Sequence, residues 1–421
     1  MVVNSSTILE GYTLARKMVA GIDDDQDVDD GLVTYKWGPK HTEDYVFDFV
    51  HGVEVHQESM MGQYYPTLEG GNAPVDSLIV KPFRLVNGLP FKKFFGWEDQ
   101  ADATEGYIIN NTHIFKTLSP DDMVAFGRQQ RYTLWESVGD DDAQVYGCLY
   151  DSIIIDMQSG GKVTCSMTAK GCEPDYAVFG TSVAAPIYPM KVDGTTQVKT
   201  LFSTCETLIW NYARISKWLT VTFQGKKKLD GFIGDDGWFQ SLDDQFPQIC
   251  GITVSAFEIP AGIRADHLAK TPHDFTWRVT KGNRDTITGA SDTVDTVTTG
   301  AKTVLMTALA GTLNQYAGDI LKVESGTGNR MWYRIISNDA ATPTTLTLYE
   351  TPADFSGEDA YITDDTTEYF EITMYDSLIA DYKKTKTKFG LVLYSFSVIS
   401  QNVRIRCKDM VRNLDIDEPT E

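Results

Sequence analysis

An acidic run near the amino end is the first group of side chains that could do chemistry. Its six aspartates are Asp23, Asp24, Asp25, Asp27, Asp29 and Asp30. Carboxylates two residues apart are typical of a calcium-binding EF-hand loop, which also needs glycine at its sixth position and glutamate at its twelfth. Counted from Asp25, those positions hold Asp30 and Lys36. We therefore expect an acidic loop without a specific metal site.

The histidines and glycine-rich turns do not form a catalytic pattern either. The six histidines are dispersed, and His51 and His56, five residues apart on one expected strand, would point to opposite faces. The segment Ser325 to Arg330 (SGTGNR) lacks the lysine of a phosphate-binding loop, so we expect a turn between strands. No GxSxG, HExxH, Walker-type or dinucleotide-binding motif occurs. We expect no enzyme activity, no cofactor and no bound metal.

Three groups of basic residues are candidates for contacts between subunits. Lys226, Lys227 and Lys228 form one dense run, which is typical of an exposed loop, and a second run lies between Lys383 and Lys388. Arg404, Arg406 and Lys408 alternate with apolar residues, so a strand would place all three on one side. In an acidic protein such cations can pair with aspartates of a neighbouring copy. The alternative is a solvated face that blunts a sheet edge.

Charge and composition limit the classes of function. The 421-residue chain has 59 acidic and 37 basic residues and a formal net charge of -22, so it would repel rather than hold duplex DNA. With 42% hydrophobic residues it can form a large core, and its many aromatic and β-branched residues favour strands. No export signal or membrane anchor is visible. The six cysteines show no CxxC pair, so we expect free thiols.

Several elements can be predicted from local patterns. Alternation over Tyr45 to Gln57 predicts one half-buried strand, and the aromatic spacing in Asn87 to Trp97 predicts a short helix. Two strands flanking Gly160 and Gly161, between Tyr146 and Gly171, predict a β-hairpin. Phe389 to Lys408 predicts one or two further strands, and the polar residues 413–421 a flexible acidic tail.

The region between Thr280 and Thr366 has a different composition, rich in Thr, Gly, Ala and Asp, with four short apolar runs. Apolar residues alternate immediately before it, at Phe275, Trp277 and Val279, and immediately after it, at Phe370, Ile372 and Met374. We therefore predict a small all-β domain, residues 281–365, inserted between two strands of one sheet. Residues 1–280 and 366–412 would form the discontinuous main domain.

The order of these features resembles that of the tail tube proteins, or major tail proteins, of long-tailed phages and archaeal tailed viruses. The resemblance is carried by Leu89 to Trp97 (LPFKKFFGW), by Tyr107 to Phe115 and above all by the hairpin from Tyr146 to Gly171. In that hairpin Gly147, Ser152, Gly160, Gly161 and Gly171 fall in places similar to those of the family. The insert is similar to a small β module of many phage structural proteins.

The resemblance implies a mainly β tail-tube fold: two packed antiparallel sheets with a short flanking helix, forming part of a hexameric β-barrel ring. It implies that stacked rings enclose the tape-measure protein and later conduct double-stranded DNA without sequence-specific binding. Other implied partners are the tail terminator and the baseplate-side tail proteins. Localisation would be the virion tail, after assembly in the host cytoplasm. The run Asp23 to Asp30 would then face the lumen, and the insert would lie outside.

Two other functions remain open. A decoration or capsid protein would share the acidic, β-rich character and the inserted module. A carbohydrate-active β-sandwich enzyme or a lectin would have aromatic residues along a groove and, in an enzyme, a close pair of carboxylates.

Overall fold

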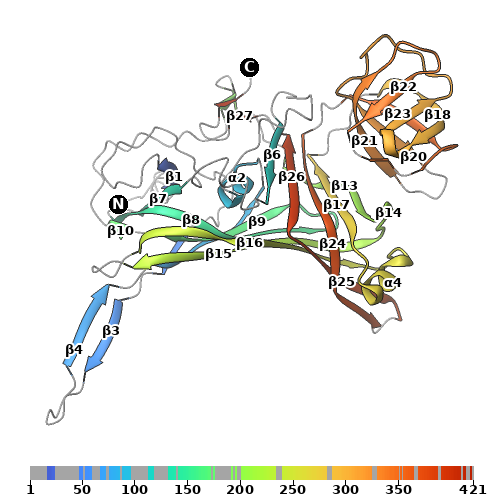
Figure 1. Ribbon diagram of the computed structural model, residues 1–421. Coiled ribbons are helices and arrows are strands. Elements are labelled where there is room, and N and C mark those ends of the chain that lie inside the picture. The colour runs from blue at the N-terminus through green and yellow to red at the C-terminus, as the bar shows by residue number, and fades with distance from the viewer. Residues whose placement is uncertain are drawn as a thin grey trace, which may run out of the picture.

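The protein is mainly β and has two parts, a large bent sheet and a closed barrel (Figure 1). The computed structural model describes residues 17–23, 47–50, 53–58, 67–72, 75–85, 88–95, 112–117, 131–138, 141–171, 174–175, 191–192, 195–196, 201–233, 239–281, 287–324, 330–349, 351–352, 354–364, 368–386, 390–408, 411–413 and 418–419. Each part has its own hydrophobic core.

The large sheet has 16 strands, and every pairing in it is antiparallel. Its main path is β14 (Ala213–Arg214), β13 (Thr204–Trp210), β17 (His273–Thr280), β24 (Tyr369–Lys386), β25 (Val392–Ser400), β16 (Phe239–Ala256), β15 (Trp218–Ile233), β8 (Asp141–Gln158), β9 (Thr164–Gly171), β5 (Val75–Arg84) and β2 (Phe47–Val50). Off this path, β26 (Asn402–Lys408) lies between β24 and β6 (Thr112–Lys116), β7 (Arg131–Val138) between β8 and β1 (Lys17–Asp23), and β10 (Pro174–Asp175) beside β8.

Strand β24 belongs to both layers of the main domain. Its residues 369–375 pair with β26, and 378–386 pair with β25. Between these segments Asp376 has a φ of 47°. We call β14, β13, β17, the first part of β24, β26 and β6 the short half-sheet, and the strands from the second part of β24 to β2 the long half-sheet. Two separate packed sheets were expected, whereas the described strands of the main domain form a single sheet that bends at β24.

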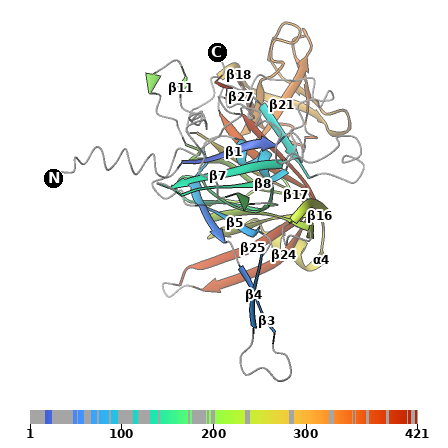
Figure 2. The ribbon, with the colours of Figure 1, turned by 90° about the vertical axis from the view of Figure 1, so that its left-hand side faces the viewer.

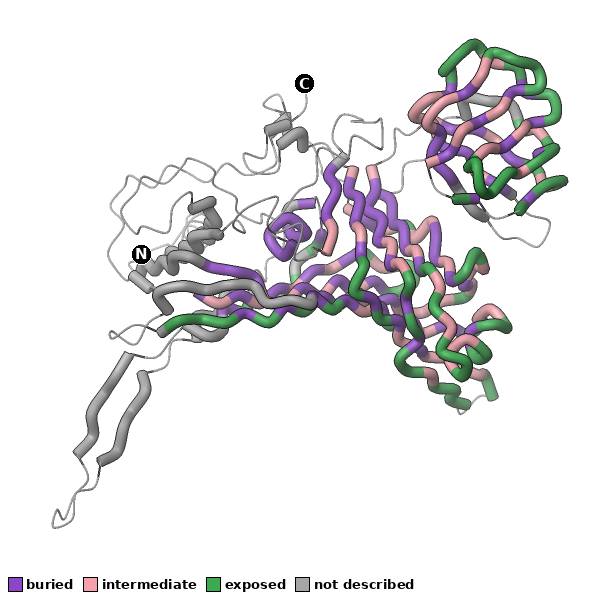
Figure 3. The backbone as a smooth tube through the Cα atoms, viewed as in Figure 1, coloured by how far each residue is buried: buried purple, intermediate pink, exposed green. Residues whose placement is uncertain are grey.

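Helix α2 (Leu89–Phe95) packs against both half-sheets, and the predicted helix is confirmed. The Phe91 ring lies 5.7 Å from that of Phe370 in the short half-sheet. On the long half-sheet, a Cβ on Gly225 would lie only 2.6 Å from Cε1 of Phe94, so glycine there lets the helix approach the strand. Buried residues occur in α2 and alternate with more exposed ones along the strands (Figure 3).

The predicted hairpin between Tyr146 and Gly171 is confirmed as β8 and β9. Gly160 in its turn has a φ of 75°, which glycine adopts without steric cost. Val163, Cys165, Met167 and Ala169 are buried, as their alternation predicted. Phe389 to Lys408 contains two strands, β25 and β26.

The single strand predicted over Tyr45 to Gln57 is wrong. Two strands occupy this region, β2 in the large sheet and β3 (Val53–Glu58), which pairs with β4 (Thr67–Asn72) in a separate two-stranded sheet. Alternation of side chains reports an extended backbone, but it cannot reveal that the chain changes its pairing partner. His56 lies in β3, whereas His51 lies outside the described residues.

The inserted barrel is formed by β18 (Ile287–Thr298), β19 (Thr303–Met306), β22 (Thr345–Leu348), β21 (Arg330–Asn338), β20 (Ile320–Glu324) and β23 (Asp359–Thr363), with a 3-10 turn at Thr299–Ala301. The strands flanking it, β17 and β24, pair as predicted, with Trp277 opposite Ile372. Residues 325–329 of the SGTGNR segment, between β20 and β21, lie outside the described residues.

The remaining elements are small. Helix α4 (Gly262–Ala269) follows β16, and β11 (Lys191–Val192) pairs with β12 (Thr195–Thr196). In the segment predicted to be a flexible tail, Glu418–Pro419 (β28) pairs with β27 (Val411–Asn413). In the described part of the chain no helix has the length and hydrophobicity to cross a membrane.

The five cysteines in the described ranges have free thiols. Burial raises the pKa of Cys250 to about 12 and that of Cys205 to about 12. Both thiols are therefore protonated at neutral pH, which makes them poor nucleophiles.

Candidate functional site: assembly surfaces and an interdomain cleft

The predicted acidic loop lies almost entirely outside the described residues. Asp23 is the last residue of β1, and the structure describes its backbone only. Asp24, Asp25, Asp27, Asp29 and Asp30 are not among the described residues. Their predicted position facing a lumen stays a prediction.

The run Lys226 to Lys228 lies within strand β15, so the expected exposed loop is wrong. Lys226 and Lys228 are exposed, and Lys228 Nζ lies 3.4 Å from Asp230 Oδ1. Lys227 points inward, with Nζ 5.0 Å from the centre of the Phe94 ring. The physical reason is the strand's alternation, which sends the middle lysine to the core side while its aliphatic chain packs against apolar groups.

Arg404, Arg406 and Lys408 share one side of β26, but this side is not a solvated edge. Strand β26 has partners on both sides, and Arg406 is only 2% exposed. Its NH1 lies 3.2 Å from Glu371 Oε1 on β24, and its guanidinium lies over the Tyr349 ring of the inserted segment, 4.8 Å from the ring centre. Arg404 donates a hydrogen bond to the Tyr349 hydroxyl. These two arginines therefore contact the insert of their own chain.

A second contact between insert and sheet is centred on Glu206. The register of β13 against β17 shifts between Cys205 and Thr207, and this bulge leaves Glu206 outside the regular pairing. Its carboxylate lies 2.9 Å from Arg278 Nε and 2.8 Å from Nζ of Lys322 on β20 of the barrel. The fully buried Arg278 guanidinium also stacks on Tyr369, 3.7 Å from the ring centre. Charged and aromatic contacts thus hold the barrel against the short half-sheet.

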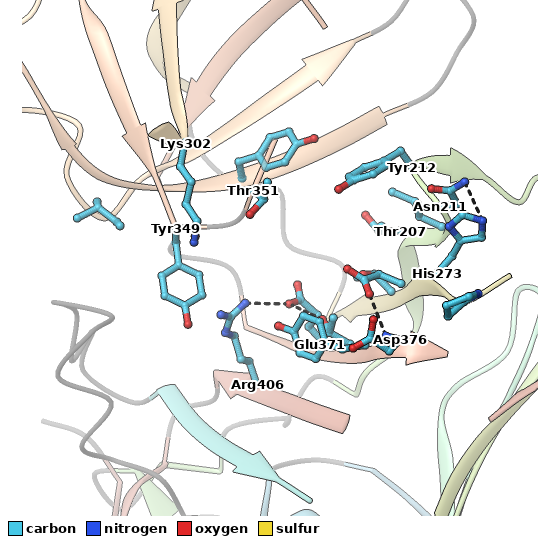
Figure 4. Close-up of a pocket in the computed structure, with 18 residues that line it drawn as sticks. Thr207, Asn211, Tyr212, His273, Lys302, Tyr349, Thr351, Glu371, Asp376 and Arg406 are labelled. Carbon is cyan, nitrogen blue, oxygen red and sulfur yellow. Dashed lines mark hydrogen bonds and ion pairs between the residues drawn. The ribbon is translucent and has the colours of Figure 1, made fainter. Parts of the chain in front are cut away.

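Beside the contact of Arg406 with Tyr349 lies a cleft of about 610 Å³ (Figure 4). Its floor is the outer face of the short half-sheet, where cross-strand neighbours form rows. One row runs from Thr207 across Arg278 and Glu371 to Arg406, and the next includes Thr276 opposite Thr373. This second row also contains Ile209 and Arg404, so the floor changes from buried ion pairs to hydroxyl groups flanked by one apolar and one basic side chain.

The rim on the sheet side is formed by the turn between β13 and β14, by the first residues of β17 and by the bend in β24. His273 Nε2 lies 3.4 Å from Asp266 Oδ1 on α4 and 3.4 Å from the Asn211 side-chain amide. Asp274 Oδ1 accepts a hydrogen bond of 3.2 Å from the backbone N–H of Asp376. Burial raises the pKa of Asp274, and this outweighs the hydrogen bond from the Asp376 N–H, which lowers it. This end of the cleft thus presents polar groups of both donor and acceptor type.

The opposite wall comes from the inserted segment. Lys302, Tyr349 and Thr351 extend from it toward the floor, across the open space from Tyr212 and Asp376 (Figure 4). Lys302 Nζ donates a 3.0 Å hydrogen bond to the Tyr349 carbonyl. The cleft therefore combines tyrosine rings, hydroxyls, carboxylates and a lysine with the apolar side chains of Ile209, Pro272 and Ile336, a set suited to binding a ligand with both polar groups and C–H faces.

Sequence reasoning missed every residue of this cleft except Arg406. The lining residues are spread along the sequence between Thr207 and Arg406, and no local sequence pattern links positions so far apart. One weak signal was available: Asn211 follows a strand-like run, and asparagine is typical of a turn, whereas Tyr212 is not a usual turn residue.

Two features of the main domain concern its outer surface. On the long half-sheet, Leu378 and Gly251 both pair with Ile399, and Ile249 lies two residues before Gly251 on the same face. Ile249 is 49% exposed, Ile399 41% and Leu378 39%, so they form an exposed apolar patch.

The β3–β4 hairpin extends away from the body in both views (Figures 1 and 2).

The described residues contain no cluster of three or more His, Cys, Asp or Glu side chains that could hold a metal ion. No protein-family model matches the chain. No curated protein is significantly similar to it.

Proposed function

We propose that this protein is a structural subunit of the tail tube of a tailed virus. Hexameric rings of the chain would stack around the tape-measure protein and later form the conduit for the genome. The proposal starts from the sequence resemblance in the hairpin between Tyr146 and Gly171. It is supported by the mainly β architecture and by the short helix α2 packed between two half-sheets.

The β3–β4 hairpin is the observation that carries the proposal. Among the described strands, β3 and β4 pair only with each other. A lone two-stranded hairpin is at best marginally stable in water, and it gains stability when a third strand or another surface covers it. A hairpin that extends from the body is suited to contact a neighbouring copy, as stacking of rings requires.

The apolar patch of Ile249, Leu378 and Ile399 supports the same proposal. Exposed apolar groups that lie together mark surfaces that bind another protein. Strands with an unpaired edge offer backbone groups to a neighbouring chain. Among the described strands, the main path of the sheet ends at β14 and β2 rather than closing. Joining such edges around a ring would convert open sheets into a continuous barrel.

The hairpin can be removed without disturbing the strands that carry it. Strands β2 and β5 pair directly beneath it, with Val50 opposite Ser77. Replacing residues 52–73 by a four-residue glycine-rich turn should therefore retain the β2–β5 ladder. Purified full-length protein is expected to form hollow filaments in negative-stain electron micrographs, whereas the shortened variant should stop at rings or monomers.

Deletion of the inserted domain, residues 281–365, is the control. Since a bore sized for one duplex has no room for extra domains, the insert must lie outside, and this variant should still form tubes. A full-length chain that stays monomeric at every concentration and with its tape partner would overturn the proposal. Shells in place of tubes would indicate a capsid or decoration protein.

A further inference from the structure

Backbone strain is concentrated at the interdomain cleft. In the described chain, seven residues other than glycine have a positive φ, and four of them line the cleft: Asn211 (46°), Tyr212 (62°), Lys302 (55°) and Asp376 (47°). Asparagine and aspartate tolerate this conformation, and Lys302 adopts it as the residue that ends the 3-10 turn, but tyrosine rarely adopts it. Residues held in such conformations cluster at functional sites, because selection keeps the side chain despite its cost.

Tyr212 is the clearest case. Trp210 pairs with Ala213, so Asn211 and Tyr212 form a two-residue hairpin turn between β13 and β14. A turn of this kind needs a positive φ at both positions and strongly favours Asn-Gly. The chain has Asn followed by tyrosine instead, and the Tyr212 ring, 44% exposed, stands at the rim of the cleft (Figure 4). Local stability would favour glycine here, so the ring needs another reason to be present.

The groups around the cleft limit the class of ligand. An anion would meet the carboxylates of Glu371, Asp274 and Asp376, and the Arg406 guanidinium already pairs with Glu371. An apolar ligand would leave hydroxyls, carboxylates and a lysine without water. A neutral ligand rich in hydroxyl groups fits, because it can donate to carboxylates, accept from Asn211 and Lys302, and lay its C–H faces on tyrosine rings.

We propose that the cleft between the inserted barrel and the short half-sheet binds a short carbohydrate chain. The Tyr212 ring stacks on one sugar, Asp376 and Asn211 bind its hydroxyl groups, and Thr276 and Thr373 line the floor beneath. Lys302 and Tyr349 close the site from the insert side. The volume of about 610 Å³ lies within the usual range of small-molecule sites. The site lies within one chain and does not depend on tube assembly.

The test uses the full-length protein and trisaccharides of glucose, mannose, galactose and N-acetylglucosamine. Saturation-transfer NMR is expected to detect binding of at least one of them at millimolar concentration, and calorimetry then gives its Kd. The decisive variant is Tyr212→Gly, which removes the ring and relieves the strained turn. It should weaken binding about tenfold, as expected for one stacked ring, and should unfold at the same or a higher temperature.

Two further variants complete the test. Lys217 also has a positive φ (50°) but does not line the cleft, so Lys217→Gly should leave the Kd unchanged. Asp376→Asn keeps the shape of the rim, removes its charge and should weaken binding about tenfold. If no saturation transfer from the protein to any of the four trisaccharides is detected, the proposal is overturned. A Kd that is the same in wild type, Tyr212→Gly and Asp376→Asn would also overturn it.

Discussion

The inserted barrel and the bent sheet differ in how the edges of their strands are paired. Each strand of the barrel has a partner on both sides, because the sheet closes on itself around its own core. Leu313 is the one large hydrophobic residue that is strongly exposed in the described part of the barrel. The main path of the large sheet stays open as far as its strands are described, and its long half carries an exposed apolar patch. Closure makes a module self-sufficient, whereas an open sheet depends on what covers it.

The largest expected losses of stability come from mutations in the two hydrophobic cores, and each mutation should destabilise only its own part. Trp277 is fully buried in the main core and Ile362 in that of the barrel. Trp277→Ala should destabilise the main domain by about 3–5 kcal/mol and Ile362→Ala the barrel by about 2–5 kcal/mol. Hydrogen exchange measured by mass spectrometry during urea unfolding should show each loss only in peptides of the affected part. Equal losses in both parts would mean that they unfold as one cooperative unit.

A smaller effect is expected where α2 meets the long half-sheet. Gly225→Ala would place a Cβ 2.6 Å from the Phe94 ring, so we expect a loss of about 1–3 kcal/mol. Gly251 is the matched control, because its nearest atom would be Val398 O at 3.3 Å and it faces outward. Gly251→Ala should change stability by less than about 1 kcal/mol. Similar urea midpoints for the two variants would contradict the close packing of α2.

The smallest effect concerns the contact between the two parts. Tyr349→Phe removes the hydroxyl that accepts from Arg404 and should weaken docking of the barrel by about 0.5–1.5 kcal/mol. Both cores should keep their stability. Small-angle X-ray scattering should show a larger radius of gyration, and the difference should grow with salt because charged contacts also hold the barrel. Tyr361→Phe, on β23 of the same barrel, is the control; an equal change there would exclude a specific role for Tyr349.

Local sequence patterns predicted many strands and turns, but they rarely predicted which other elements these pair with or pack against. The alternation around Trp277 and Ile372 located two strands and their partnership across the inserted domain, and Gly160 located a turn. The same reasoning missed the division between β2 and β3, because both are extended and only their partners differ. It also took Lys227 for part of an exposed loop, although a strand buries it against Phe94.

By itself, the sequence determined the β-rich character, the position of the inserted domain and the faces of its clearest strands. These follow from side-chain period and turn-forming residues, which act over a few neighbouring positions. Only the tertiary structure decided that Arg406 lies beneath the insert and that Tyr212, Asp376 and Lys302 surround one cleft. Such placements depend on strand order, register and domain packing, which bring together residues that are far apart along the chain.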